Sequence, residues 1–428
     1  MAALLDYLNV KPRLFYGWVI IVALGVTITV SYGALYYSMG VFLAPLRDDS
    51  GWSSSAISGA FSVAILFSGL AGIVVGRLTD RYGSRLVMSV GSVLGALGLA
   101  MFSMAHEIWQ IYFAWGLVIG CASAASFYPP AFTAVTAWFE RKTGRALGLL
   151  TFLGGFASII FIPLTSQLID EFGWRTAARL LALVILLIAF PLHAAVLRRR
   201  PADLGLTPDG RVEVKPETNK GVVRERTDAH NGSASGEGIF WVITASFFCA
   251  SFATTTVFVH QIPHLVDSGF SATDVATAAG LIGVASLPGR FVLSSLTEKV
   301  DAAVITCGVL VLMGLSLAVL IFAASLLVVY AYVLLFGVGF GAITPLRGAI
   351  MADHFGRAGY GKTLGMQGAV LAVAAAGGPL AAGAMRDASG SYETAFLLMA
   401  ALYFAAAGLI SLTALMPGAR AAQASVET

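Results

Sequence analysis

Two arginines lie inside long apolar stretches of this 428-residue chain, where charged side chains are rare. Arg290 belongs to the stretch 273–297, and Arg347 belongs to 326–351, two residues after Pro345. A guanidinium group binds a carboxylate through two parallel hydrogen bonds. We therefore predict that Arg290 binds an organic anion, with pairing to helix carbonyls or a loop acid as its alternative. Arg347 has either a substrate contact or a structural or gating role.

Tyrosines are the second group that could contact such an anion. Tyr128 precedes Pro129 and Pro130, which interrupt the hydrogen-bond ladder of a helix. Its phenol can donate to a carboxylate or pack in the core. Tyr32 and Tyr36 share one face of the first apolar stretch, and Tyr37 lies about 100° further round the helix. We favour Tyr36 as the residue that faces a cavity.

Histidine titrates near neutrality, so His260 is our candidate for carrying a proton. The alternative is a histidine at the outer surface, which is also our interpretation of its neighbour His264. Two histidines are too few for a zinc site. The three cysteines show no ligand spacing, and there is no phosphate-binding loop. We therefore predict no metal, no cofactor and no enzymatic activity.

The composition predicts an integral membrane protein. Hydrophobic residues make up 58% of the chain and charged residues 11%, against about 25% charged in soluble domains. This balance excludes a disordered chain and a nucleic-acid-binding protein. A bilayer crossing needs about 20 apolar residues. Twelve such stretches are present: 15–43, 53–76, 85–105, 109–138, 144–168, 175–197, 239–263, 273–297, 302–323, 326–351, 362–385 and 393–416.

The distribution of charge predicts the orientation. With twelve crossings both termini share one side, and twenty Lys and Arg fall there against four on the other side. Positive residues favour the cytoplasm, so we place both termini inside. Residues 198–238 are polar and rich in Gly, Ser and Pro, which is typical of a flexible linker. The predicted organisation is a six-helix bundle (1–197), a cytoplasmic linker (198–238) and a second six-helix bundle (239–428).

The turn after the second stretch carries a compact motif. It contains two glycines, one acid and two bases: Gly76, Asp80, Arg81, Gly83 and Arg85. The pair Asp80-Arg81 is echoed by Glu298-Lys299, 218 residues later. Such an echo predicts two halves with the same orientation and a binding site between them near the bilayer midplane.

This motif resembles the signature loop of the major facilitator superfamily, whose acid and bases form a cytoplasmic charge relay that holds the outward-open state. Two positions depart from it: Ser84 replaces a common Arg, and Ser294 replaces the first glycine of the echo. The resemblance covers essentially the whole chain. It implies an all-α membrane fold of twelve transmembrane helices in two pseudo-symmetric six-helix bundles.

A finer resemblance is to bacterial monocarboxylate porters, including oxalate/formate exchangers. It rests on Tyr16-Gly17-Trp18, on the stretch 138–148 (WFERKTGRALG) and on the position of Arg290. Eukaryotic monocarboxylate porters tend to have an Asp four residues before this arginine, where this chain has Ser286. Their proton relay therefore cannot be transferred to this chain.

The resemblance implies a secondary active transporter of small organic anions, foremost monocarboxylates such as lactate or pyruvate. We expect alternating access with proton-coupled symport. The alternatives are exchange of carboxylates such as oxalate and formate, export of drugs or metabolites, and a transporter-like receptor. The expected partners are a small carboxylate, a proton or counter-anion, and the lipid bilayer. We expect a monomer in a bacterial cytoplasmic (inner) membrane.

Overall fold

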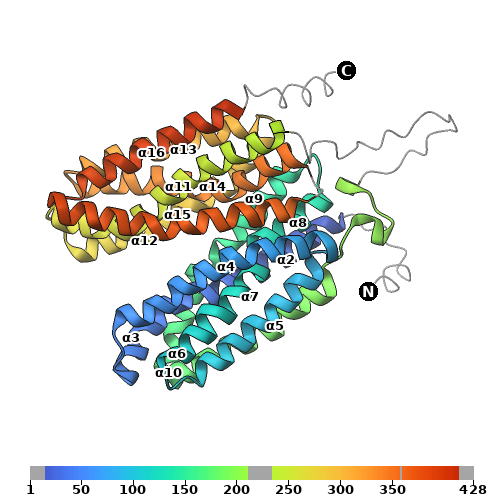
Figure 1. Ribbon diagram of the computed structural model, residues 1–428, viewed down its shortest axis with the longest axis horizontal. Coiled ribbons are helices and arrows are strands. Elements are labelled where there is room, and N and C mark those ends of the chain that lie inside the picture. The colour runs from blue at the N-terminus through green and yellow to red at the C-terminus, as the bar shows by residue number, and fades with distance from the viewer. Residues whose placement is uncertain (1–14, 211–233, 357–358, 414–428) are drawn as a thin grey trace.

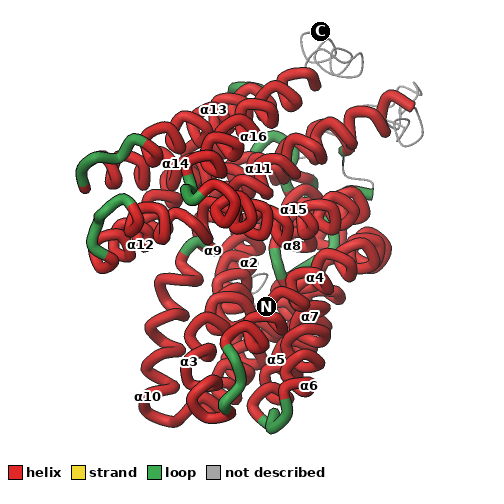
Figure 2. The backbone as a smooth tube through the Cα atoms, turned by 60° about the vertical axis from the view of Figure 1, so that its left-hand side comes forward, coloured by secondary structure: helices red, strands yellow, loops and turns green. Residues whose placement is uncertain are grey.

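The computed structural model describes residues 15–210, 234–356 and 359–413. Within these ranges the regular structure is entirely helical (Figure 2). The predicted terminal segments and the centre of the predicted linker, 211–233, lie outside the described residues.

The first half is built from the following segments: α2 (Tyr16–Tyr32), η1 (Gly33–Tyr37), α3 (Ser38–Ser50), α4 (Ser54–Tyr82), α5 (Ser84–Ser103), α6 (Ile108–Ile111), η2 (Tyr112–Ile119), α7 (Gly120–Ser126), α8 (Tyr128–Trp138), α9 (Thr143–Gly154), α10 (Phe156–Val184), η3 (Ile185–Ala189) and η4 (Leu192–Val196). Two short 3₁₀ turns follow: η5 (Pro201–Leu204) and η6 (Pro208–Gly210).

The second half is built from the following segments: α11 (Ala234–Asp267), α12 (Ala272–Pro288), η7 (Gly289–Leu293), η8 (Leu296–Glu298), α13 (Ala302–Ile321), α14 (Leu326–Phe355), α15 (Tyr360–Ser389) and α16 (Glu393–Leu412). Segments η1, η2, η3, η4 and η7 are π-helical turns within longer helices.

Eleven helices of the described chain are long and apolar enough to cross a membrane. One of them, Thr143–Val196, has 54 residues, whereas one crossing needs about 20. Its helical geometry is broken at Gly173, whose φ of +75° is accessible to glycine at little cost. The break divides this segment into two crossings, so the expected twelve-helix, all-α fold is confirmed.

The two halves form two bundles that meet at one end and diverge toward the other (Figure 1). We call the end where α8 finishes and α15 starts the linker end, because the chain passes from one bundle to the other there. The opposite end carries the end of α3 and the start of α12, which lie apart in both views (Figures 1 and 2).

The turns at this opposite end have the same local structure in both halves. Gly51 and Gly269 have φ of +74° and +93°, values that favour glycine. Two residues later, the hydroxyls of Ser53 and Ser271 accept hydrogen bonds from backbone N–H groups at 3.2 and 3.1 Å. Both serines are N-caps, so the repeat predicted from the sequence reproduces the local backbone structure.

Glycines bring the two bundles together near the linker end. A Cβ atom on Gly76 of α4 would overlap the backbone of Gly361 in α15, and one on Gly365 would overlap the carbonyl of Gly72. Close approach of this kind is the usual reason for small residues between membrane helices. The bundles are therefore packed backbone to backbone at this level.

Candidate functional site

A cavity of about 450 Å³ lies between the two bundles. Its lining residues come from both halves of the chain and include no Asp or Glu among those described. Ligand sites are commonly concave and mostly apolar, with a few converging polar groups. Eight aromatic residues line this one: Tyr32, Tyr36, Tyr37, Phe61, Phe127, Tyr128, Phe247 and Phe340.

Arg290 lies on the wall of this cavity, in the π-helical turn η7 that follows Pro288. Its side chain is largely buried, with 9% of the residue exposed. Nε donates to the Ser286 hydroxyl at 3.3 Å. Nη1 donates to the hydroxyl of Tyr128 at 3.4 Å and to the carbonyl of Thr151 at 3.2 Å. The last two partners belong to the other bundle, so Arg290 joins the two halves at the cavity.

Arg347 lies on the same wall, in α14. Its Nε atom is buried and has no hydrogen-bond partner among the described residues. Tyr32 lines the same cavity, and the hydroxyl of Tyr360 donates to the Gly348 carbonyl at 2.7 Å. A buried polar atom without a partner calls for an explanation.

The predicted tyrosines also reach the cavity. Tyr128 is almost fully buried beside Arg290, and Tyr36 is 37% exposed. The expected break before Pro129 is present, since Phe127 is extended between α7 and α8. The sequence placed Tyr37 on another face from Tyr32 and Tyr36. All three line the cavity because 33–37 forms a π-helical turn, which changes the angular spacing of the side chains.

His260 is not among the residues that line the central cavity. Its Nε2 atom lies 3.0 Å from the carbonyl oxygen of Pro379, and its ring packs 5.2 Å from that of Tyr392. The ring is thus held between α11 and neighbouring helices of the same bundle. His264 packs against Phe396 at 5.0 Å.

At the linker end, Asp80 joins the two bundles. Its Oδ1 accepts a hydrogen bond from the backbone N–H of Gly361, and its Oδ2 accepts one from Lys362, both at 2.8 Å. These N–H groups belong to the first turn of α15, where a helix has free donors and a partial positive charge. Asp80 of one bundle therefore caps a helix of the other.

The motif around Asp80 divides into buried and exposed members. Gly76 packs on α15, and Gly83, with φ of +84°, turns the chain from α4 into α5. Arg81 and Arg85 are exposed, and the ion pairs of the described residues include neither. Asp80 thus bonds to backbone N–H groups instead of the arginines of its own motif.

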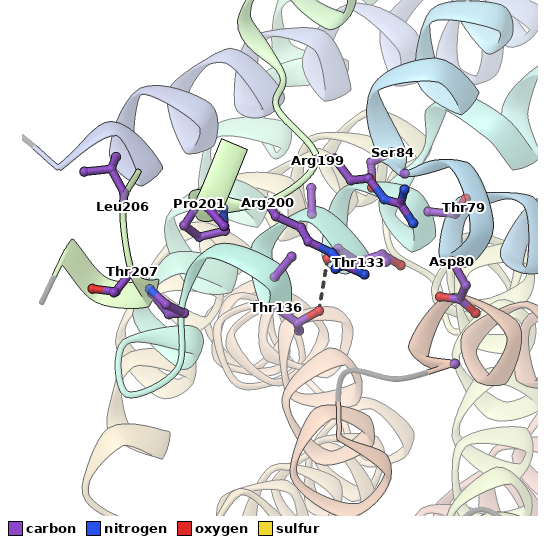
Figure 3. Close-up of a pocket in the computed structure, with 16 residues that line it drawn as sticks. Thr79, Asp80, Ser84, Thr133, Thr136, Arg199, Arg200, Pro201, Leu206 and Thr207 are labelled. Carbon is purple, nitrogen blue, oxygen red and sulfur yellow. Dashed lines mark hydrogen bonds between the residues drawn. The ribbon is translucent and has the colours of Figure 1, made fainter. Parts of the chain in front are cut away.

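A second cavity, of about 760 Å³, lies beside Asp80 at the linker end. Figure 3 shows Arg199 and Arg200 extending into it. The Ser84 hydroxyl donates to the Pro130 carbonyl at 2.7 Å, and Thr136 donates to the Thr133 carbonyl at 3.1 Å (Figure 3). The central cavity is the better candidate for a substrate site, because it carries a buried arginine nitrogen that has no hydrogen-bond partner among the described residues.

Ion pairs of the described residues are confined to the end opposite the linker. They are Arg47–Asp48, Arg175–Asp49 and Arg386–Asp267. Hydrogen bonds from Arg175 and Trp174 lower the pKa of the Asp49 carboxyl below its usual value. Within the part of the chain that the structure describes, the central arginines have no comparable acidic partner.

Sequence reasoning missed several partners of the predicted site. Phe127 stacks on Tyr32 at 3.9 Å, and the guanidinium of Arg290 lies 5.9 Å from the ring of Phe340. The proline pair after Tyr128 predicted an interruption of the helix, and the structure places it at Phe127. The Thr151 carbonyl carries no sequence signal, since every residue has one.

The chain is similar in sequence to known membrane transporters. The model of the Major Facilitator Superfamily matches residues 24–346. Monocarboxylate transporter 13 of Rattus norvegicus is 25% identical over 400 residues, which cover 92% of this chain and 88% of the relative. Monocarboxylate transporter 11 of Homo sapiens is 25% identical over 402 residues, covering 90% and 80%.

Among solved structures, the superfamily transporter FucP in the outward conformation superposes with a TM-score of 0.70. It is 17% identical, and the match covers 93% of this chain and 99% of FucP. This likeness concerns the fold. The family match, the twelve crossings and the two facing bundles agree, and the chain belongs to the major facilitator superfamily as a multi-pass integral membrane protein.

Proposed function

We propose that this protein is a secondary active transporter of small organic anions, with the substrate carboxylate bound at Arg290. The observation that carries the proposal is a buried guanidinium on a cavity whose described lining contains no acid. An unpaired buried cation is costly, and a carboxylate would compensate it. Monocarboxylates such as lactate and pyruvate are the first candidates, because the relatives at 25% identity are named monocarboxylate transporters.

The mechanism we propose is alternating access. The bundles 1–197 and 239–428 rock about the cavity, with 198–238 as their connection. Tyr128 and Thr151 hold Arg290 from the opposite bundle, so a carboxylate that takes over these bonds changes the coupling between the bundles. Tyr36 completes the site, while Asp80 and Gly76 hold the linker end closed.

For the location, we propose that the linker end faces the cytoplasm. This rests on the excess of Lys and Arg at that end. The resemblance to bacterial porters favours a bacterial cytoplasmic membrane, and we propose that the protein acts there as a monomer.

Proton symport and anion exchange are the two candidate modes. His260 is our candidate for symport, although it lies outside the cavity lining. One observation favours exchange: the described lining has two arginines and no carboxylate, so returning an empty cavity through the membrane would bury two uncompensated charges.

The test is uptake of labelled L-lactate, pyruvate and oxalate into proteoliposomes, with Arg290→Ala as the control. Accumulation that needs both an inward proton gradient and Arg290 would support symport. Accumulation that needs a preloaded carboxylate and Arg290 would support exchange. The proposal fails if these and a wider panel of carboxylates neither bind nor cross the membrane.

A further inference from the structure

The second cavity arginine, Arg347, has features of a ligand contact. It lies on the cavity wall, its Nε atom is buried without a hydrogen-bond partner, and none of the described ion pairs includes it. Arg290 differs, because three protein hydrogen bonds already use its Nε and Nη1 atoms. None of the described hydrogen bonds uses its Nη2. Each arginine therefore has at least one N–H donor left for an acceptor that the described residues do not supply.

The helices that carry the two arginines pack side by side in the same direction. A Cβ atom on Gly337 of α14 would overlap Ala285 of α12, and one on Gly341 would overlap the backbone of Ser286. One crossing, α13, separates α12 from α14 in the chain, so the two helices run in the same direction. A Cβ atom on Gly289 would also overlap the backbone of Val338. Residues 285–289 are therefore level with 337–341.

This register sets the relative depth of the two arginines. Position 290 is level with about 339–345 of α14, so Arg347 lies two to eight residues further on, which is about 3–12 Å of helical rise. The axes of packed helices are about 8–10 Å apart. Both arginines thus line one cavity from two adjacent helices.

Aromatic rings line the same cavity as the two arginines. Tyr128 accepts a hydrogen bond from Arg290, and Tyr32 lines the cavity together with Arg347. The Tyr32 and Tyr128 ring centroids are 5.0 Å apart, and Tyr32 stacks on Phe127. A molecule that reaches both arginines passes over these rings, which favour a flat, apolar body.

We propose that the preferred substrate is a dicarboxylate with a flat aromatic body, in which Arg290 binds one carboxylate and Arg347 the other. This inference rests on the proposed function, since it assigns a substrate class to the same cavity. A monocarboxylate compensates one of the two cations, whereas a dicarboxylate compensates both. None of the described lining residues is an acid that could compensate the second cation.

The test is calorimetric binding of benzoate, phthalate, isophthalate and terephthalate to the purified full-length protein at neutral pH. We expect at least one dicarboxylate to bind about tenfold more tightly than benzoate, the value of one added charge-assisted hydrogen bond. The order among the three isomers then reports the spacing of the two guanidinium groups.

Variants distinguish the contributions of the two arginines to binding. Arg347→Gln should weaken the best dicarboxylate about tenfold and change benzoate binding little, whereas Arg290→Gln should weaken both. Benzoate binding shows that Arg347→Gln is folded. Arg347→Lys keeps the charge and should keep part of the preference for the dicarboxylate over benzoate. If Arg347→Gln does not fold, the ratio of dicarboxylate to benzoate affinity in the natural protein still decides the question.

Three outcomes would overturn the inference. The first is benzoate affinity equal to that of all three dicarboxylates, and the second is an equal loss for benzoate and dicarboxylates in Arg347→Gln. The third is binding of lactate with none of the aromatic acids, which would leave the proposed function standing. Absence of binding for lactate and all four aromatic acids would count against the proposed function itself.

Discussion

The linker end and the central cavity use polar groups in opposite ways. At the linker end, the Asp80 carboxylate accepts two backbone hydrogen bonds at 2.8 Å, and glycine backbones of the two bundles touch. In the cavity, two arginines face aromatic rings with no acid among the described lining residues. One region is complete without a ligand, while the other lacks an anion. The difference indicates that the linker end holds the bundles together in the resting state and that the central cavity responds to substrate.

The largest effect is expected at Arg290. Arg290→Ala should lower transport of any accepted carboxylate by about 100-fold or more, because two charge-assisted hydrogen bonds are lost at about 1.5–3 kcal/mol each. Arg290→Lys keeps the charge and should retain part of the rate. Initial uptake rates in proteoliposomes measure both. Full activity in both variants would remove Arg290 from the site.

A smaller effect is expected where the bundles touch. Gly76→Ala places a methyl group against the backbone of Gly361, and overpacking of this kind costs about 1–3 kcal/mol, so transport should fall about tenfold. The matched control is Gly383→Ala, also on α15, where an added Cβ meets nothing within 4 Å. Equal uptake rates in the two variants would show that backbone contact at the linker end is unimportant.

Asp80→Asn should act through the first turn of α15. The amide keeps one acceptor oxygen and replaces the other with an NH2 donor, so one of the N–H groups of Gly361 and Lys362 loses its acceptor, at a cost of about 1 kcal/mol for a partly exposed group. Hydrogen exchange at residues 360–365 should therefore become several-fold faster. Glu298→Gln, the counterpart in the second half, should leave this segment unchanged. Unaltered exchange in Asp80→Asn would argue against the cap.

The smallest effect is expected at the opposite end, at Asp49. Its pKa is lowered by Arg175 and Trp174, so the ionised form stabilises the fold above the ordinary Asp pKa of about 3.9. This stabilisation is lost as the pH falls through the lowered pKa. Asp49→Asn should melt slightly below the natural protein at pH 7, and the difference should vanish in acid. Asp48→Asn is the control; a difference independent of pH would contradict this account.

Long apolar runs made the fold predictable. Each crossing had a stretch of about 20 residues, and the gap between 168 and 175 coincides with the break at Gly173. The predicted end of the second span, at 76, came too early, since α4 continues to Tyr82. Charged residues at 77, 80 and 81 end an apolar run without ending a helix.

The site was predictable only in part. A buried arginine is unusual enough to single out Arg290 from the sequence alone. Its partners Tyr128 and Thr151 are 162 and 139 residues away, so only the fold brings them together. The same holds for Asp80 and Gly361, which are 281 residues apart. Periodicity also misjudged Tyr37, because an ideal helical wheel does not represent a π-helical turn.

The most direct test of the account is a distance across the open end of the cavity. Spin labels at Gly40→Cys in α3 and Gly280→Cys in α12, where an added Cβ meets nothing within 4 Å, report the separation of the bundles. A saturating transported carboxylate should shorten this distance in the natural background and leave it unchanged in Arg290→Ala. An unchanged distance in the natural background, or the same shortening in both, would contradict it.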